Sequence, residues 1–275
     1  MKYTKEYIAA RRAIAKEDYD GEDEDYRSDQ QLQVPPPPLT KAPVSCDRTL
    51  LPMDFECLEL KNDTLALIRD RTSHRVYTGQ AMTLLELSFL LWATQGIRAI
   101  RGNNYATLRT VPCGGARHEF ETYLAVRDVQ GLKPGAYHYL PMSAELEFIG
   151  DIADYENSVS NSLNEQKWGS TANVVFYWSA VPYRAEWRYG PFTHRVMLID
   201  AGHICQNLYI ACEALGLGTC AVASFDRQLC NSIFKLDDVD EFIVYTAPVG
   251  CVSAADKEKE DDFYAFLKKG FTEND

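Results

Sequence analysis

The chain has 275 residues, of which 46% are hydrophobic and 12% aromatic, and a formal net charge of −12 at pH 7. This composition predicts a globular protein with a sizeable core and excludes a largely disordered chain. The negative charge argues against nucleic acid or an anionic membrane as the main partner, because both call for a basic surface.

Neither membrane insertion nor secretion is predicted. The longest apolar stretch, residues 84–93, contains Glu86 and is far shorter than the ~20 residues that a bilayer span needs. The first seven residues lack the apolar core of a signal peptide, and the eight cysteines form no CxxC pair. We therefore expect a cytoplasmic protein whose cysteines are buried thiols in a reducing compartment.

Residues 1–60 differ in composition from the rest of the chain. Residues 17–25 carry seven acids and no base, and Pro35 to Pro38 are followed by Pro43 and Pro52. Consecutive prolines favour extended polyproline II, which cannot form a central strand. We expect an extended acidic and proline-rich arm over residues 1–60 and one domain over residues 61–275.

The folded part is predicted to begin near Asp63. Thr83 and Glu86 form a capping-box pattern before a buried helix that ends at Gly96. A second long helix, residues 195–215, has a small and apolar face, which predicts a homodimer interface. Further helices are expected over residues 151–167 and after Asp226. Strands are expected over residues 121–129, 136–140, 145–149, 174–181, 219–225 and 242–249. This mixture has no regular βαβ repeat and predicts an α+β fold with a mixed, mainly antiparallel sheet flanked by helices.

Several common binding motifs are absent from the sequence. The five histidines have no HxxxH or HxH spacing, so no metal site is predicted. The chain has no GxGxxG and no GxxxxGK[ST] pattern, so neither a Rossmann nor a P-loop phosphate site is supported.

Residues 71–75 are the first segment that could carry chemistry. Arg71 and Arg75 share a face if the segment is helical, and Arg71, Ser73 and Arg75 share a side if it is extended. Either arrangement lets two guanidinium groups and a hydroxyl converge on one anion such as phosphate. A solvated helix start is the alternative.

The other three segments combine glycine or aromatic residues with exposed backbone. Gly114 and Gly115 follow Pro112 and Cys113 and would let the backbone approach a flat ligand closely, or form an ordinary turn. Residues 182–194 are aromatic and basic without a regular period, which predicts a loop that serves as a lid or as a protein–protein contact. Residues 216–225 predict a helix end that turns tightly into a strand.

Taken together and in this order, these segments resemble the nitroreductase superfamily, and within it the SagB-type (SagB/ThcOx-like) FMN-dependent dehydrogenases. Arg71-Thr-Ser-His-Arg75 resembles the flavin-phosphate segment, and Arg109-Thr-Val-Pro-Cys-Gly-Gly-Ala-Arg117 resembles the element along the flavin ring. Gly135-Ala-Tyr-His-Tyr139 and Asp200-Ala-Gly-His-Ile-Cys-Gln-Asn207 resemble further elements of the subgroup, the latter in its long dimer helix.

The resemblance implies an FMN cofactor and a set of residues that bind it. These residues are Arg71, Thr72, Ser73, Arg75, Pro112, Cys113, Gly114, Gly115, Ala221, Val222, Ala223 and Ser224. A backbone N–H among the last four would meet flavin N5. The superfamily's distal phosphate-binding cation would correspond to Lys257 or Lys259.

The implied reaction is hydride transfer between flavin N5 and a small-molecule or peptide substrate, with Tyr189 as the proton-transferring group and Arg188 as the cation that lowers its pKa. Two residues depart from the subgroup pattern: Cys113 replaces serine, and Arg188 replaces the lysine of azoline oxidases. The resemblance therefore does not by itself imply azoline oxidation. Two other functions remain open, a stand-alone NAD(P)H-dependent nitro- or quinone reductase and a non-catalytic flavin-binding scaffold of a peptide-modifying complex.

Overall fold

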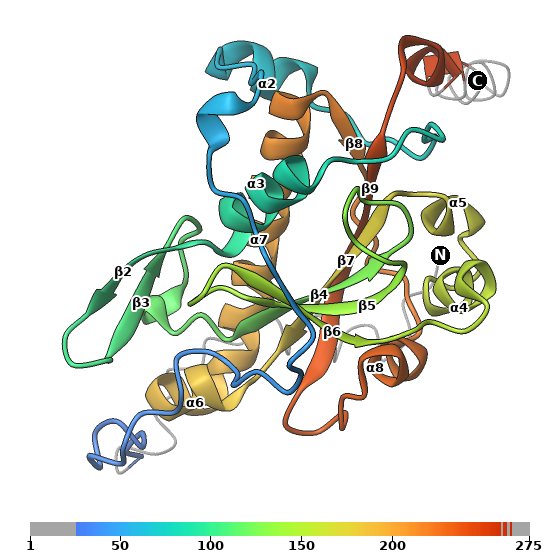
Figure 1. The fold of residues 1–275 in the computed structure, drawn as a ribbon. Coiled ribbons are helices and arrows are strands. Elements are labelled where there is room, and N and C mark those ends of the chain that lie inside the picture. Colours follow the sequence, from blue (N-terminus) through green and yellow to red (C-terminus); the bar gives the residue numbers. More distant parts are fainter. Residues whose placement is uncertain (1–25, 260, 263–264, 266–275) are drawn as a thin grey trace, which may run out of the picture.

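The protein is described by a computed structural model that covers residues 26–259, 261–262 and 265 (Figure 1). The acidic run at residues 17–25 lies outside the described residues. The strands are β1 (Arg48–Leu50), β2 (Ile97–Arg101), β3 (Ala106–Arg109), β4 (Phe120–Val126), β5 (Gly135–Leu140), β6 (Glu145–Gly150), β7 (Val174–Ala180), β8 (Leu217–Thr219) and β9 (Phe242–Cys251). The helices are α2 (Thr64–Asp70), α3 (Leu84–Gln95), α4 (Tyr155–Ser162), α5 (Lys167–Ser170), α6 (Tyr183–Tyr189), α7 (Thr193–Leu215) and α8 (Arg227–Phe234).

A seven-stranded sheet in the order β1-β6-β5-β4-β7-β9-β8 forms the centre of the fold, and each neighbouring pair in it is antiparallel. Helices α3 and α7 cover one face, and α4 and α8 cover the other (Figure 1). The central strands β4 and β7 are buried at every residue, as expected for a sheet covered on both faces. The predicted α+β fold with a mainly antiparallel sheet is confirmed.

Several predicted elements are confirmed, together with the residues that were expected to begin or end them. Thr83 and Glu86 form the complete capping box of α3, and Gly96 follows its last residue. Asp226 caps α8 through the N–H of Leu229 at 2.9 Å, and the strands predicted over residues 136–140 and 145–149 are β5 and β6, which form an antiparallel hairpin. Gly216 ends α7 in the left-handed conformation, with φ 72°.

Three predictions on single elements are wrong. Residues 182–194 are not a loop, because they contain helix α6, a short 3-10 turn and the start of α7. The polar helix expected over residues 151–167 is divided into α4 and α5, since Asn164 and Glu165 adopt positive φ between them. The strand expected over residues 219–225 lies earlier, at β8, and beyond it only Val222 bridges to Thr246.

The described part of the proline-rich arm lies on its own chain. Strand β1 pairs with the edge strand β6, and the N–H groups of Val44 and Ser45 donate to the buried Glu147 carboxylate at 2.7 and 2.8 Å. Cys46 and Cys57 lie in this arm and are exposed, so the expectation of buried thiols is wrong for them.

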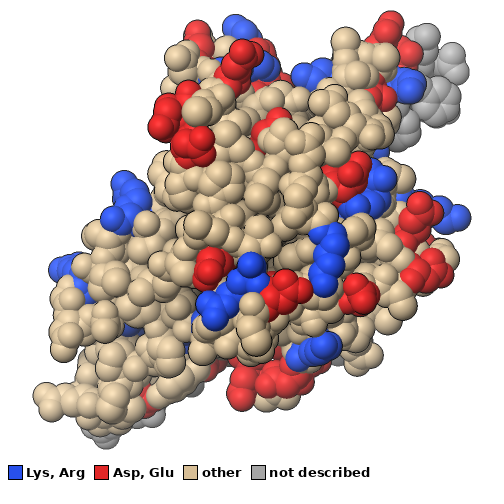
Figure 2. Space-filling model, in the orientation of Figure 1, with Lys and Arg blue, Asp and Glu red and all other residues tan. Residues whose placement is uncertain are grey.

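Charged side chains are interspersed on the face that Figure 2 shows, where lysine and arginine do not gather into one continuous patch. None of the helices in the described ranges has the length and apolar character needed to cross a membrane.

Candidate functional site

Residues 71–75 form an extended segment that lies against α7. The guanidinium of Arg71 lies 5.2 Å from the ring centre of Tyr209, and Ser73 Oγ lies 3.0 Å from the Tyr209 hydroxyl. Thr72 and His74 contact each other instead, with 3.0 Å between Oγ1 and Nε2. The alternation of an extended backbone therefore places Arg71 and Ser73 together at Tyr209.

Tyr209 also joins this segment to the residues after β8. Its hydroxyl accepts a hydrogen bond from the N–H of Ala221 at 2.8 Å. Arg75 lies over the ring of Trp168, at 5.8 Å from its centre. In the described part of the chain, Arg71 has no carboxylate within ion-pair distance. The predicted segments 71–75 and 216–225 thus meet at Tyr209, a residue of α7 that was not predicted to belong to the site.

The backbone of residues 221–224 presents free hydrogen-bond donors. Ala221 donates to Tyr209, and Val222 donates to the carbonyl of Thr246 at 2.8 Å. The N–H groups of Ala223 and Ser224 make no hydrogen bond to any described residue, and both residues are exposed. Of the four predicted backbone contacts, these two are available to a ligand.

The glycine pair of the second segment lies against the third segment. Residues Gly114–Ala116 form a single 3-10 turn in which Gly115 has φ +56°. A Cβ at Gly115 would clash with the phenol oxygen of Tyr189 and would lie 2.9 Å from Arg188 Nε. Glycine is therefore required here by both backbone conformation and space. Pro112 is exposed at the start of this turn, and Cys113 is half-buried.

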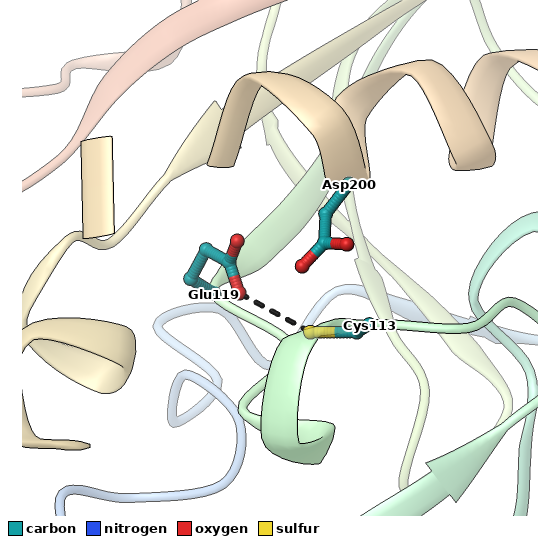
Figure 3. A group of neighbouring side chains, drawn as sticks. All are labelled: Cys113, Glu119 and Asp200. Atoms are coloured by element: carbon teal, nitrogen blue, oxygen red, sulfur yellow. Dashed lines mark hydrogen bonds between the residues drawn. The ribbon is translucent and has the colours of Figure 1, made fainter. Parts of the chain in front are cut away.

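A buried acidic pair, Glu119 and Asp200, lies between the turn and helix α7 (Figure 3). Asp200, on α7, accepts the N–H of Gly114 at 2.8 Å and contacts His203 Nδ1 at 3.3 Å. The Cys113 thiol lies 3.3 Å from Glu119 Oε2, and the other oxygen, Glu119 Oε1, has no hydrogen-bond partner. Ligand atoms of the three side chains lie within 4.8 Å of one another, close enough to surround one cation.

Burial determines how these groups ionise. It raises the pKa of Glu119 to about 7, with a smaller contribution from Asp200. Burial also raises the pKa of the Cys113 thiol, and the neighbouring carboxylates Glu119 and Asp200 add to the effect. A thiol in this setting stays protonated near neutral pH and does not act as a nucleophile.

Helix α6 holds Arg188 and Tyr189 beside the glycine turn. Arg188 donates from Nη1 to the hydroxyl of Tyr105 at 3.0 Å, and its guanidinium lies 5.4 Å from the ring centre of Tyr189. The helix is anchored by Arg184, which pairs with the buried Glu121 carboxylate at 2.5 Å. The two residues predicted to carry proton chemistry thus lie on a helix rather than in a loop.

Within one chain, the predicted site residues form two groups along α7. Asp200 contacts the group at Gly114, and Tyr209 contacts the group at Ser73 and Ala221. Asp200 and Tyr209 are nine positions apart on α7, about 13–14 Å along the helix axis.

The predicted C-terminal lysines lie away from both groups. Lys257 lines a cavity of about 350 Å³ together with Thr72 and His74, on the side of the extended segment opposite Tyr209. Lys259 is exposed and lies 3.6 Å from Asp256.

The sequence prediction missed Tyr105, Arg117, Glu119 and Tyr209. Arg117 and Glu119 flank the glycine turn within a stretch already noted, so their nearness to the turn was an available signal. Tyr105 and Tyr209 reach the site only through tertiary packing and leave no local signal.

Comparisons with known proteins converge on one family. The nitroreductase family model matches residues 68–251. A putative nitroreductase of Methanocaldococcus jannaschii is 34% identical over 199 residues, which cover 72% of this chain and 93% of that protein. The trifolitoxin-processing protein of Rhizobium leguminosarum is 32% identical over 144 residues, covering 49% of this chain and 38% of its own. The crystal structure of a putative nitroreductase from Ralstonia eutropha superposes with a TM-score of 0.62 at 21% identity, covering 80% of this chain and 99% of that one.

Proposed function

The chain belongs to the nitroreductase family, and on that premise we propose that it is an FMN-dependent oxidoreductase. In this proposal, hydride passes between the flavin and a small-molecule or peptide substrate, as in SagB-type dehydrogenases. Similarity to a trifolitoxin-processing protein supports the peptide alternative. NAD(P)H is a candidate reductant, and the location expected from the sequence, the cytoplasm, is part of the proposal.

The residues at the two groups fit a flavin mononucleotide. Arg71 has no acidic partner among the described residues and lies beside the Ser73 hydroxyl, as a phosphate site requires. The free N–H groups of Ala223 and Ser224 suit the polar edge of a flavin ring. At the other group, the turn at Gly115 exposes backbone beside the Tyr189 phenol. Arg71, Ser73 and Arg75 would hold the phosphate, and Pro112 to Gly115 would lie along the ring.

FMN would supply a two-electron acceptor or donor at N5, and the chain would supply position and proton transfer. The observation that carries the proposal is the contact of the Tyr189 phenol oxygen with the turn at Gly115, with Arg188 beside it. The phenol oxygen of Tyr189 would take or give the proton that accompanies hydride transfer. The guanidinium of Arg188 would stabilise negative charge there.

We also propose a homodimer in which α7 contributes to the interface. Leu198 and Ile199 on α7 are 67% and 52% exposed, and Leu65 and Ile68 on α2 are 72% and 65% exposed. Exposed apolar side chains on neighbouring helices are typical of a subunit interface. A two-fold pairing about the middle of α7 would bring the Gly114 end of one subunit towards the Tyr209 end of the other.

The division into an arm, residues 1–60, and an FMN-binding domain, residues 61–275, remains part of the proposal. We further propose that the proline-rich arm, an extended segment with no core of its own, contacts a partner subunit beside the contacts it makes with its own chain.

A flavin spectrum of the purified protein, followed by anaerobic titration with candidate reductants, tests the proposed function. We expect bound FMN at about one per subunit and bleaching by a substrate of the dehydrogenase type. Rapid bleaching by NAD(P)H alone would favour the stand-alone reductase. Bound flavin that no reductant bleaches would favour the scaffold, and the absence of flavin binding would reject the proposal.

A further inference from the structure

Arg117 is a buried cation that has no counter-ion among the described residues. Arg117 is only 5% exposed, yet no carboxylate of the described residues lies within 4.0 Å of its guanidinium. Nε donates to the carbonyl of Gly115 at 3.2 Å, and Nη2 donates to the carbonyl of Tyr105 at 2.9 Å. Nη1 makes no hydrogen bond to a described residue. Carbonyl dipoles offset only part of the cost of burying a charge, which an anion would complete.

Arg188 brings a second guanidinium to the same place. Its Nη1 donates to the Tyr105 hydroxyl at 3.0 Å, while Arg117 lies over the Tyr105 ring at 4.7 Å and over the Trp187 ring at 5.2 Å. Arg188 likewise has no acidic partner in the described part of the chain. Burial lowers the pKa of Arg117, and the neighbouring charge of Arg188 lowers it further. Two like charges are held together beside two aromatic rings.

No nearby acid of the described residues forms an ion pair with Arg117 or Arg188. Glu119 contacts the Cys113 thiol through Oε2, and its Oε1 has no hydrogen-bond partner. Glu121 pairs with Arg184 and His138, at 2.5 and 3.0 Å. Asp200 accepts the Gly114 N–H and contacts His203. In the part of the chain that the structure describes, no carboxylate therefore forms an ion pair with the Arg117–Arg188 pair.

We infer that Arg117 and Arg188 form an anion subsite that binds a carboxylate or phosphate group of the substrate beside Tyr189. That the bound anion belongs to a substrate rests on the proposed function. Anion binding by the two arginines does not itself require flavin. Arginine suits this task because its planar fork matches both anions. The half-buried ring of Tyr105 would pack against the apolar part of a ligand whose anionic end the arginines hold, while the buried ring of Trp187 supports Arg117 from within. The substrates favoured are those with an acidic group close to the reacting bond.

Tryptophan fluorescence of the flavin-free protein tests the subsite, because Trp187 touches Arg117. The probes are benzoate, its neutral analogue benzamide, and inorganic phosphate. We expect a saturable fluorescence change with benzoate, much weaker binding of benzamide, and loss of the signal in Trp187→Phe. Arg188→Gln should weaken benzoate binding about 10- to 100-fold, as expected for a lost charged hydrogen bond. Arg101→Gln is the matched control, since Arg101 lies exposed on the hairpin that also carries Tyr105.

Arg117→Lys keeps the charge but loses the fork, and it should weaken benzoate binding without abolishing it. If Arg117→Lys fails to fold, Arg188→Gln still tests the anion subsite, because Arg188 is only partly buried and its substitution should leave the fold intact. Tighter binding of phosphate than of benzoate would identify a phosphate-bearing substrate such as a nicotinamide nucleotide, and the reverse would identify a carboxylate. Equal binding of benzoate and benzamide, or equal affinities in Arg188→Gln and Arg101→Gln, would overturn the inference. A protein that binds benzoate as expected but never binds FMN would reject the proposed function alone.

Discussion

The hydroxyl of Tyr209 lies 3.0 Å from the Oγ of Ser73 and accepts the N–H of Ala221 at 2.8 Å. One phenol of the long helix therefore fixes two chain segments that are more than a hundred residues apart. Both segments contain residues proposed to hold FMN, so the position of this phenol determines the geometry of one half of the proposed site.

Tyr209→Phe is expected to lower FMN affinity roughly 5- to 30-fold, because it removes two hydrogen bonds worth about 1 kcal/mol each. Equilibrium dialysis of FMN measures the change. Tyr155→Phe is the control, since it removes a comparable hydrogen bond, to the carbonyl of Ala125 at 3.0 Å, on the other face of the sheet. An equal loss of affinity in both variants would mean that the effect comes from general destabilisation.

The double substitution of Arg71 and Arg75 to alanine should reduce FMN occupancy after purification. Removing one charged phosphate partner costs about 1.5–3 kcal/mol, or roughly 10- to 100-fold in affinity. Arg69→Ala is the matched control, because Arg69 is exposed and pairs with the adjacent Asp70. Undiminished flavin absorbance in the double variant would reject the phosphate assignment.

The proposed dimer predicts that Leu198→Glu combined with Ile199→Glu yields a monomer. Charges placed in an apolar interface lose hydration without gaining a partner. Light scattering at micromolar concentration measures the mass, and Val239→Glu, at a site that is 75% exposed, is the control. A wild-type protein that is already monomeric would contradict the proposal.

Elements that are stabilised by residues close to one another in the chain could be predicted from the sequence. The capping box of α3 needs only Thr83 and Glu86, whose side chains meet at 2.7 Å, and the hairpin of β5 and β6 follows from alternation and turn residues. Helix α6 was missed because one of its buried positions is Arg184. That charge is tolerated in the interior because Glu121, 63 residues away, pairs with it, and no periodicity rule anticipates such a pairing.

The candidate site was predictable in its parts but not in its assembly. Arg71, Ser73 and Gly115 stand out by residue type, but their partners Tyr209 and Tyr189 come from helices distant in sequence. The ionisation of Glu119 likewise depends on how deeply the fold buries it, which its position next to β4 does not reveal.

Glu119→Gln is expected to change the pH dependence of stability. Burial raises the Glu119 pKa from 4.5 to about 7, so the folded chain holds this proton more tightly than the unfolded chain does. The stabilising contribution is complete below pH ~4.5 and is lost as the pH rises through 7. At pH 8 the variant should therefore be more stable than the wild type by about 1–3 kcal/mol, and the difference should shrink towards pH 5. Urea denaturation at both pH values measures the difference in the free energy of unfolding. Glu165→Gln, at an exposed site, is the control. A difference that does not depend on pH would contradict the raised pKa of Glu119.

Tyr189→Phe tests the chemistry directly. The phenol oxygen lies against the turn at Gly115, where a Cβ would collide with it, and Arg188 lies over its ring. A phenol with an ordinary pKa of ~10 is a poor base near neutral pH and needs such a neighbouring cation. Arginine supplies the charge but does not exchange a proton, so the proton should move through Tyr189 alone. The variant should keep its fold and its FMN but reduce the rate of flavin reduction by substrate roughly 10²- to 10⁴-fold, the usual contribution of a general base. Anaerobic stopped-flow bleaching of the flavin measures the rate. Tyr183→Phe, on the exposed side of the same helix, is the control. A wild-type rate in Tyr189→Phe would remove Tyr189 from the mechanism.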